Sequence, residues 1–500
     1  MYVLLYRIGF IILLIVSSTM ITGCMVGANF HSPRSPQLHS YTEKSMPVKT
    51  VAAPAAGRAG KSQTFVNGQN ISAEWWYLFH SNDLNHLIAK GLANSPNLEA
   101  AYAALRVAQE TLNAQIGNSL FPAFNAGFSG ERQRFSAASI DGGTQTTLFN
   151  LFNTSVTVAY TLDVFGGARR QIEALRAQVD YQQFQLIAAY LTLSANIVTT
   201  AVTVSAYQAQ IDATLALIRI EQNQLNIMEK QLRLGGISLE TVLTQQTLVY
   251  QTRATLPPLQ KSLAQSKHAL LALVGELPNN PLPDIKLDNI HLPTQLPVSL
   301  PSYLVRQRPD VRASEALLHA ACANVGVATA NLFPQFTING NYGWESSVLP
   351  QLFNPVSKVW AITGGITQPV FHGGALFAAR RQAIATYDQT AAQYKQTVLT
   401  AFQNVADTLR ALETDARTLQ AQQRAETAAH RNLILTQKQY FLGGASYLSL
   451  LNAQQQYQTL LISVIQAKAI RYNDTAALFQ ALGGGWWNKR WCVKECLNAT

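Results

Sequence analysis

The chain has 500 residues, of which 48% are hydrophobic and only 13% are charged, against roughly 25% charged in an ordinary soluble domain. This composition excludes intrinsic disorder and a long soluble coiled coil stabilised by surface ion pairs. After the N-terminus no uninterrupted apolar stretch approaches ~20 residues, which excludes a helical membrane protein with several spans.

The net charge of +10 raises the question of a nucleic-acid partner. The Lys and Arg residues are scattered through Gln- and Ala-rich segments, without a dense run or an aromatic-interleaved basic stripe. Because nucleic-acid binding needs a clustered basic surface, we expect no nucleic-acid partner.

The first 23 residues predict a lipoprotein signal peptide. Arg7 precedes an apolar run at residues 8–16, which is too short for a spanning helix. The tetrapeptide Ile-Thr-Gly-Cys that ends at Cys24 resembles the bacterial lipobox, in which the cysteine receives acyl chains such as palmitate. Met25 is not the Asp that retains enterobacterial lipoproteins on the inner membrane, so we expect Cys24 to be lipidated in the outer membrane of a Gram-negative bacterium. Ordinary signal cleavage beside an incidental cysteine is the alternative.

The rest of the chain reads as two similar halves. Three landmarks recur in the same order about 210 residues later: Phe121-Pro122 as Phe333-Pro334, Phe165-Gly166-Gly167 as Phe371-His372-Gly373-Gly374, and Leu234-Gly235-Gly236-Ile237-Ser238 as Leu442-Gly443-Gly444-Ala445-Ser446. The organisation we predict is a signal peptide at 1–23, a lipidated N-terminal segment at 24–90, repeat 1 at 91–277, a Pro-rich linker at 278–301, repeat 2 at 302–483 and a C-terminal tail at 484–500.

Each half contains one very long predicted helix. Residues 168–234 and 375–442, 67 and 68 in number, contain no Gly and no Pro and are rich in good helix formers. A helix of that length measures about 100 Å and needs neighbours of equal length to bury an apolar stripe. Shorter helices are predicted at 97–116, 239–274, 310–330 and 447–482, with a break in the second of them at Pro257 and Pro258.

Between the first two landmarks of each half, apolar and polar residues alternate with the period of a β-strand. The apolar positions are Phe124, Ala126, Phe128, Phe152, Val156, Val158, Tyr160, Leu162, Phe336, Ile338, Tyr342 and Trp344, and a fourth strand at 360–367 alternates more weakly. A soluble, half-buried sheet gives the same pattern, but the lipobox and the long helices favour membrane strands. Four strands cannot close a barrel, and lipid does not tolerate an open sheet edge, so other copies must complete the sheet. Three copies give twelve strands and more room for a water-filled lumen than the eight strands of two copies.

The reactive residue types do not form an enzyme site. The nine histidines show no HExxH pattern, and GxSxG, Walker and GxGxxG motifs are missing from the sequence. We therefore expect no catalysis, no metal and no cofactor. Cys322 lies in an Ala-rich helix and is predicted to be a small core residue, whereas Cys492 and Cys496 in the tail form either a disulfide or two free thiols.

Nearly the whole mature chain resembles the TolC-like outer membrane factors, in particular the lipoprotein branch that serves tripartite drug-efflux pumps. The resemblance is carried by Cys24, by Glu74-Trp75-Trp76 followed by Asp83-Leu84-Asn85, by the paired Phe-Pro and Gly-Gly landmarks, and by Ala481-Leu482-Gly483-Gly484-Gly485-Trp486. It implies a mixed α+β membrane protein, in which a homotrimer forms a twelve-stranded β-barrel continued by a long α-helical periplasmic tunnel. Each chain would contribute four strands and two internal repeats, with a mixed equatorial region formed by the N-terminal segment, the linker and the C-terminus.

The resemblance also implies partners. A periplasmic adaptor (membrane fusion) protein would meet the helical tips at the two Leu-Gly-Gly turns, and an inner-membrane RND-type transporter would supply the energy. The tip residues matched to this role are Gly235, Gly236, Ser238, Gly443, Gly444 and Ser446. The plainer interpretation, that the glycines only allow the chain to reverse, is compatible with this contact.

The family's closed gate corresponds to positions just beyond the second turn. Leu448 matches an apolar ring, and Asn452 stands where the family has an acidic residue. The resemblance therefore predicts an apolar constriction at Leu448 but puts a ring of carboxylates in doubt. An uncharged Asn at the mouth would weaken the attraction of cations.

Two pairs of arginines, Arg169-Arg170 and Arg380-Arg381, follow the Gly-Gly turns at which a strand becomes a helix. This position at the base of the predicted barrel suggests contact with phosphate headgroups of outer-membrane lipid. A solvated charge at the start of a helix is the alternative.

Together these features predict the passive outer-membrane exit channel of a tripartite efflux pump for drugs or toxic small molecules. The first alternative is the outer-membrane duct of a type I protein secretion system, whose family members more often lack lipidation. The alternative of another class is a trimeric surface fibre or adhesin, which would carry a long exposed passenger instead of helices bracketed by strand pairs.

Overall fold

The structure is a computed structural model, and it describes residues 25–36, 38, 40–43, 46–136, 146–299 and 301–488. The predicted signal peptide, Cys24, Cys492 and Cys496 lie outside the described residues. The chain divides into two compact units, each built from separate stretches of sequence. Unit 1 combines residues up to Pro33 with Ala104–Gln183 and Ala313–Lys395, and unit 2 contains Arg34–Ala103, Phe184–Arg312 and the residues from Gln396 onward.

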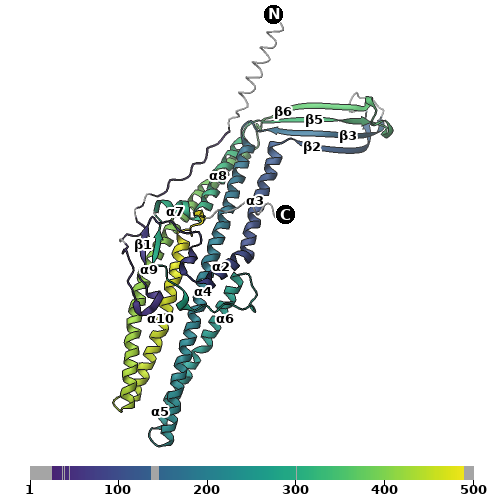
Figure 1. The fold of residues 1–500 in the computed structure, drawn as a ribbon. Coiled ribbons are helices and arrows are strands. Elements are labelled where there is room, and N and C mark those ends of the chain that lie inside the picture. The colour runs from purple at the N-terminus through teal and green to yellow at the C-terminus, as the bar shows by residue number, and fades with distance from the viewer. Residues whose placement is uncertain are drawn as a thin grey trace. The chain divides into compact units, whose positions relative to one another are not determined.

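The elements follow the same order in both halves (Figure 1). The first half contains α3 (Pro96–Leu120), β2 (Ala123–Ser136), β3 (Thr146–Leu162), α4 (Gly167–Arg233), α5 (Leu239–Ala254) and α6 (Leu256–Leu273). The second contains α8 (Pro309–Ala330), β5 (Gln335–Ser346), β6 (Lys358–Thr367), α9 (Ala375–Phe441) and α10 (Tyr447–Ala481). The smaller elements are β1 (Thr64–Asn67), α2 (Asn82–Asn94), β4 (Gln295–Val298), α7 (Pro301–Gln307) and several short 3-10 turns.

The predicted helix boundaries are confirmed to within a few residues. The long helices α4 and α9 both have 67 residues and agree with the Gly- and Pro-free stretches to within one residue at each end. The predicted break before Pro257 falls at Thr255, which ends α5 and begins α6. Proline is tolerated there because the first turn of a helix has no intrahelical acceptor for its missing N–H.

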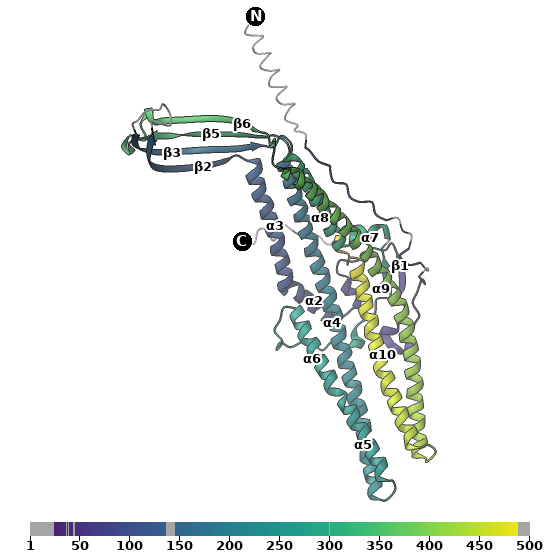
Figure 2. The ribbon, with the colours of Figure 1, turned by 180° about the vertical axis from the view of Figure 1, so that it is seen from behind.

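Unit 1 contains a four-stranded antiparallel sheet in the order β2-β3-β5-β6. The strands lie side by side in both views (Figures 1 and 2). The chain runs from the first hairpin to the second through α4, α5, α6, the Pro-rich linker, α7 and α8. All four predicted strands are therefore confirmed, including the weakly alternating fourth.

Unit 2 is centred on Trp75, whose side chain is fully buried and stacks on Phe479 of α10 with ring centroids 5.2 Å apart. The three glycines at positions 483–485 all have positive φ, and a Cβ at any of them would collide with a neighbouring atom. The next residue is Trp486, whose indole Nε1 donates a hydrogen bond to the Gln307 carbonyl at 2.6 Å. The Glu-Trp-Trp and Gly-Gly-Gly-Trp motifs are thus parts of the core of unit 2.

The N-terminal segment and the Pro-rich linker also meet in unit 2. Strand β1 pairs with β4 in parallel, and Arg471 of α10, which is fully buried, donates hydrogen bonds to the carbonyls of Ala59 and Lys61. This agrees with the mixed region that the sequence resemblance implies.

One helix among the described residues, α4, contains a stretch long and apolar enough to cross a membrane. Within that stretch 61% of the residues are buried inside the protein, and Ile197 and Val198 are completely buried. Packing inside the protein accounts for the apolar character of this stretch.

Candidate functional site

The sheet of unit 1 has one apolar and one polar face. Its register aligns Ala126, Val156, Tyr342 and Trp360 in one row across the four strands, and the neighbouring row contains Asn125, Thr157, Asn341 and Ala361. Because successive residues of a strand point to opposite faces, the two rows face opposite sides of the sheet. On the apolar side large side chains are exposed, with Phe124 at 68%, Trp360 at 70% and Ile362 at 76%.

A continuous exposed apolar face of this kind requires cover by lipid or protein. An apolar face toward lipid with a polar face toward a lumen is the pattern of an outer-membrane strand. The two outer strands, β2 and β6, each have a partner on one side only within the described part of the chain. The sheet therefore offers two edges at which another copy can pair.

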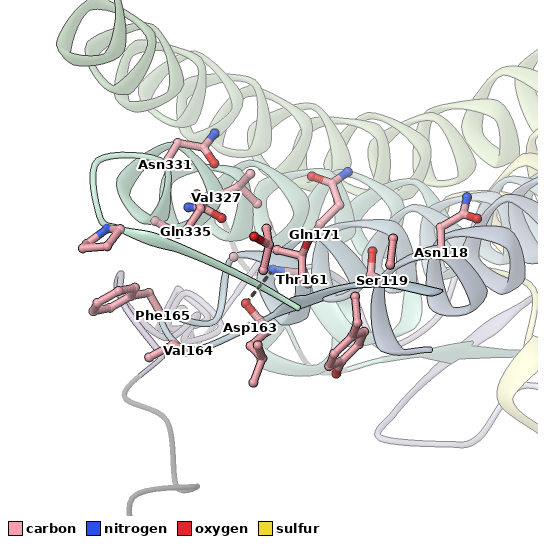
Figure 3. A pocket seen from close by; sticks show the side chains of 18 of the residues that line it. Asn118, Ser119, Thr161, Asp163, Val164, Phe165, Gln171, Val327, Asn331 and Gln335 are labelled. Atoms are coloured by element: carbon pink, nitrogen blue, oxygen red, sulfur yellow. Dashed lines mark hydrogen bonds between the residues drawn. The ribbon is translucent and has the colours of Figure 1, made fainter. Parts of the chain in front are cut away.

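A pocket of about 530 Å³ lies where the polar face of the sheet meets helices α3, α4 and α8. Figure 3 shows amide and hydroxyl side chains around it, among them Asn118, Thr161, Gln171 and Asn331. Its lining contains one carboxylate, that of Asp163, and no Lys, Arg or His. This wall is polar and nearly neutral.

The negative charge of Asp163 is balanced by donors at the start of helix α4. Its carboxylate accepts hydrogen bonds from the backbone N–H groups of Ala168 and Arg169 at 3.0 and 2.9 Å, and it forms an ion pair with the Arg169 side chain at 3.1 Å. A carboxylate at a helix N-terminus is stabilised both by the unpaired N–H groups and by the helix dipole.

The four predicted basic residues at the strand–helix junctions do not share one environment. Arg380 and Arg381 are exposed, and Arg169 is paired with Asp163. The lipid-headgroup expectation is wrong for Arg170, whose side chain is 1% exposed and donates all its hydrogen bonds to groups of its own chain. A buried guanidinium needs such acceptors, because leaving it unpaired costs several kcal/mol.

The two Leu-Gly-Gly turns have the same geometry. In the first, the N–H of Gly236 donates to the Gln231 carbonyl at 2.8 Å, and in the second Gly444 donates to Gln439 at 2.8 Å. Both turns close a helix with a left-handed residue, Gly235 at φ 72° and Gly443 at φ 76°. Positive φ is therefore needed at the first glycine of each pair and not at the second.

Each turn is followed by a serine that caps the next helix. Ser238 accepts a hydrogen bond from the Thr241 N–H, and Ser446 accepts one from the Ser449 N–H. The leucines before the glycines are among the most exposed apolar residues, with Leu234 at 86% and Leu442 at 87%. Each turn thus presents a capped tip with an exposed leucine.

The predicted gate residues lie one helical turn apart on α10. Leu448 is 63% exposed and Asn452 is also exposed within the single chain. Residues four apart on a helix share a face, so these two side chains point in the same general direction.

Sequence reasoning missed a polar network behind this face. The Tyr447 hydroxyl donates to Gln245 Oε1 of α5, and Gln245 Nε2 donates to the Glu221 carbonyl of α4 at 3.0 Å. A second bond joins Gln454 Nε2 of α10 to Gln224 Oε1 of α4 at 2.7 Å, and both side chains are buried. The network connects the α4–α5 hairpin with α10 of the other hairpin.

Glu221 is a buried acid within this network. Its side chain is 2% exposed and accepts one hydrogen bond, from Thr252 Oγ1 at 3.1 Å. Burial raises the pKa of this carboxyl to about 7, and the hydrogen bond from Thr252 offsets only part of that effect. The Gln-rich composition of the helices was a signal for such a network, but it gave no partner for any one residue.

The described residues contain no group of three or more side chains suited to hold a metal ion. Cys322 is buried and unpaired with another cysteine, which confirms its prediction as a core residue. The candidate functional features among the described residues are therefore the two faces of the sheet, the two Leu-Gly-Gly turns and the polar pocket.

Comparison with known proteins identifies relatives that are outer-membrane components of efflux pumps. The family model described as outer membrane efflux protein matches residues 87–276 and 300–484. The chain is 28% identical over 478 residues to the probable efflux pump outer membrane protein TtgC of Pseudomonas putida, covering 95% of this chain and 96% of that protein. It is 27% identical over 467 residues to the cation efflux system protein CusC of Escherichia coli, covering 93% and 96%.

The fold is also that of a solved channel. The CmeC outer membrane channel of Campylobacter jejuni superimposes with a TM-score of 0.83 over 93% of this chain and 96% of that one, at 21% identity. The chain therefore belongs to the outer membrane efflux protein family and is the outer-membrane channel component of an efflux pump.

Proposed function

We propose that three copies of the chain form a closed channel in the outer membrane of a Gram-negative bacterium. The observation that carries this proposal is the four-stranded sheet, with one exposed apolar face, one polar face and an edge strand on each side. Pairing of β6 in one copy with β2 of the next satisfies both edges at once. A cyclic arrangement of three copies gives twelve strands, and a closed sheet is the only kind of sheet that lipid accepts.

The conduit is passive and polar. The polar face of the sheet and the neutral pocket beneath it give a wall of amides and hydroxyls, in which Asp163 is paired with Arg169. Such a wall offers few strong binding positions, so a solute that enters can leave. The energy for transport comes from an inner-membrane RND-type transporter.

The helical tips meet a periplasmic adaptor protein. Support comes from the two matched turns, each with a serine-capped helix start and an exposed leucine. Exposed apolar side chains of this kind mark surfaces that contact another protein. The residues that form these contact surfaces are Gly235, Gly236, Ser238, Gly443, Gly444 and Ser446.

The periplasmic entrance is narrowed by α10. Leu448 supplies an apolar ring and Asn452 an uncharged ring when three copies surround the axis. Support comes from the exposure of both side chains within a single chain and from their position on one helical face. The polar network of Tyr447, Gln245 and Glu221 holds α10 against α4 and α5 on the other side.

Lipidation at Cys24 anchors the N-terminus in the outer membrane. The lipobox supports this assignment, and several acyl chains together hold more firmly than one. Incorporation of labelled palmitate into the wild-type chain and its loss in Cys24→Ser test this part. Unlabelled wild-type protein would refute it.

The cargo is a set of small toxic molecules. Relatives are named for toluene efflux, for antibiotic efflux and for pyoverdine export, all of them small organic compounds. The test is a deletion strain with a complementing plasmid, grown against dyes, antibiotics, detergents and organic acids while its secreted proteins are profiled. Hypersensitivity that the intact gene reverses supports small-molecule efflux. Normal tolerance together with one large protein missing from the medium would instead support type I secretion.

A further inference from the structure

Residues 25–30 run along the start of helix α4 as a bound segment. The Val26 N–H donates to the Phe165 carbonyl at 3.1 Å, next to the junction of β3 and α4. Met25 packs against Gly166, where a Cβ would lie only 2.6 Å from Met25 Cγ. The N-terminal segment is therefore fitted to the strand–helix junction within unit 1.

Arg170 is the centre of this contact. Its Nε donates to the Val26 carbonyl at 3.1 Å, and its Nη2 donates to the Gly27 carbonyl at 3.1 Å and to Asn29 Oδ1 at 2.9 Å. The remaining bond goes to Glu173 Oε2 at 2.7 Å. Three of the four acceptors of a fully buried guanidinium thus come from the N-terminal segment.

The space around the Arg170 side chain is also closely fitted, because two glycines lie where a larger residue would collide. A Cβ at Gly326 of α8 would lie 2.9 Å from the Cγ and Cδ atoms of Arg170. A Cβ at Gly27, which has φ 93°, would lie 2.7 Å from the Gly326 Cα atom. Two glycines, one in the segment and one in α8, therefore leave the space that the guanidinium and the segment occupy.

Two further contacts hold the other end of the segment. The Phe30 ring stacks on His319 with centroids 4.5 Å apart, and His319 Nε2 lies 2.9 Å from Glu173 Oε1. The thiol of Cys322 donates to the Ala28 carbonyl at 3.7 Å. Glu173 consequently connects Arg170 with His319, and the segment covers the thiol.

We propose that Arg170, Glu173, His319, Cys322 and Gly326 form a socket for residues 25–30, and that the socket fixes the lipid anchor at the junction of β3 and α4. The anchor part rests on the proposed lipidation of Cys24, which directly precedes Met25. Adjacent Cα atoms are about 3.8 Å apart, so a seated Met25 leaves an anchor on Cys24 almost no freedom to move away from the junction. Arg170 acts as a positioning residue for that anchor.

The second half of the chain supplies a matched control. Arg380 and Arg381 follow the corresponding Gly-Gly turn, and both side chains are exposed. Arg381→Gln therefore removes the same charge from an equivalent junction without touching the socket. Asn29→Ala is the complementary variant, because it removes one acceptor from the segment and leaves Arg170 intact.

The thiol of Cys322 reports directly on docking, because the segment covers it. The assay uses the full-length membrane protein carrying Cys492→Ser and Cys496→Ser, and it measures the rate at which a maleimide labels Cys322. We expect Arg170→Gln to increase that rate at least tenfold, Asn29→Ala to increase it less, and Arg381→Gln to leave it unchanged. Equal rates in all four proteins would overturn the socket.

The role of the socket in positioning the lipid anchor on Cys24 is measured separately. Labelled palmitate shows whether Cys24 is acylated, and the complemented deletion strain shows whether the channel works. With acylation unchanged, we expect Arg170→Gln and Asn29→Ala to lower drug tolerance and Arg381→Gln to preserve it. Full tolerance in Arg170→Gln with an exposed Cys322 would overturn the positioning role. Wild-type protein that lacks palmitate but protects Cys322 would refute the anchor while the socket stands.

Discussion

The hydroxyl of Tyr447 donates a hydrogen bond to the side-chain oxygen of Gln245, and this bond joins α10 of one hairpin to α5 of the other. Tyr447 directly precedes Leu448, the residue that we assign to the periplasmic constriction. Movement of α10 away from α5 would have to break the bond. The relationship therefore places a specific restraint immediately behind the proposed gate.

Removing that restraint should favour the open channel. Tyr447→Phe keeps the ring and deletes the hydroxyl, and a hydrogen bond worth about 1 kcal/mol corresponds to an approximately fivefold shift between closed and open states. We expect a higher open probability in planar lipid bilayers. Tyr440→Phe is the control, because it alters a neighbouring ring and leaves the Tyr447–Gln245 bond in place. Indistinguishable openings in the two variants would argue against the restraint.

A carboxylate at position 452 should change ion selectivity. Asn452 is exposed on the same face of α10 as Leu448, and Asn452→Asp would add one negative charge per chain at the proposed mouth. We expect greater selectivity for cations over anions, measured as a shift of reversal potential in a salt gradient across a bilayer. An unchanged reversal potential would show that position 452 does not face the ion path.

Glu221 should make stability depend on pH. Because burial raises its pKa from 4.5 to about 7 in the folded protein, the folded state holds this proton more tightly than the unfolded state does. The stability associated with the proton is present below about pH 4.5 and is lost as the pH rises to about 7.

Glu221→Gln removes this dependence. At pH 8 the variant should be more stable than the wild type by on the order of 2–3 kcal/mol per chain, and the difference should shrink toward pH 5. Thermal unfolding in detergent at both pH values measures it. Glu229→Gln, which changes an exposed acid on the same helix, should show no such pH-dependent gain. A constant difference between pH 5 and pH 8 for Glu221→Gln would contradict the prediction.

The two glycines of the first tip should respond differently to alanine. Gly235 has φ 72°, so Gly235→Ala forces a Cβ into a left-handed conformation that costs about 1–2 kcal/mol. At Gly236 φ is not positive and a Cβ would meet the Gln231 carbonyl at 3.4 Å, an ordinary contact. We expect Gly235→Ala to lower the unfolding temperature and weaken adaptor binding, with Gly236→Ala close to wild type. Equal effects of the two substitutions would show that backbone conformation does not decide the shape of the tip.

The sequence was sufficient for most of the secondary structure. Glycine and proline mark the ends of α4 and α9, and Pro257 locates the break between α5 and α6. The period of two identified even β6, where two glycines weaken the apolar pattern. Each of these signals depends only on residues close together in the chain, so it can be recognised in a single sequence.

The socket and the polar network could not be predicted in the same way. Arg170 and Arg381 both belong to an arginine pair that follows a Gly-Gly turn, and only the fold reveals that Val26, 144 residues away from Arg170, supplies one of its acceptors. Gln245 and Gln454 are ordinary helix formers in sequence, and glutamine is usually exposed. Their burial depends on partners in other helices, which composition does not identify.

In the proposed channel the two edges of the sheet are paired by other copies of the chain. Electron cryomicroscopy of the full-length protein in lipid nanodiscs tests it most directly, because it shows the number of copies and the partner of each edge strand. We predict three copies and a closed wall of twelve strands, with β6 of each copy beside β2 of the next. A sheet that stays open at β2 or β6, or a closed wall built from another number of copies, would refute the trimeric channel.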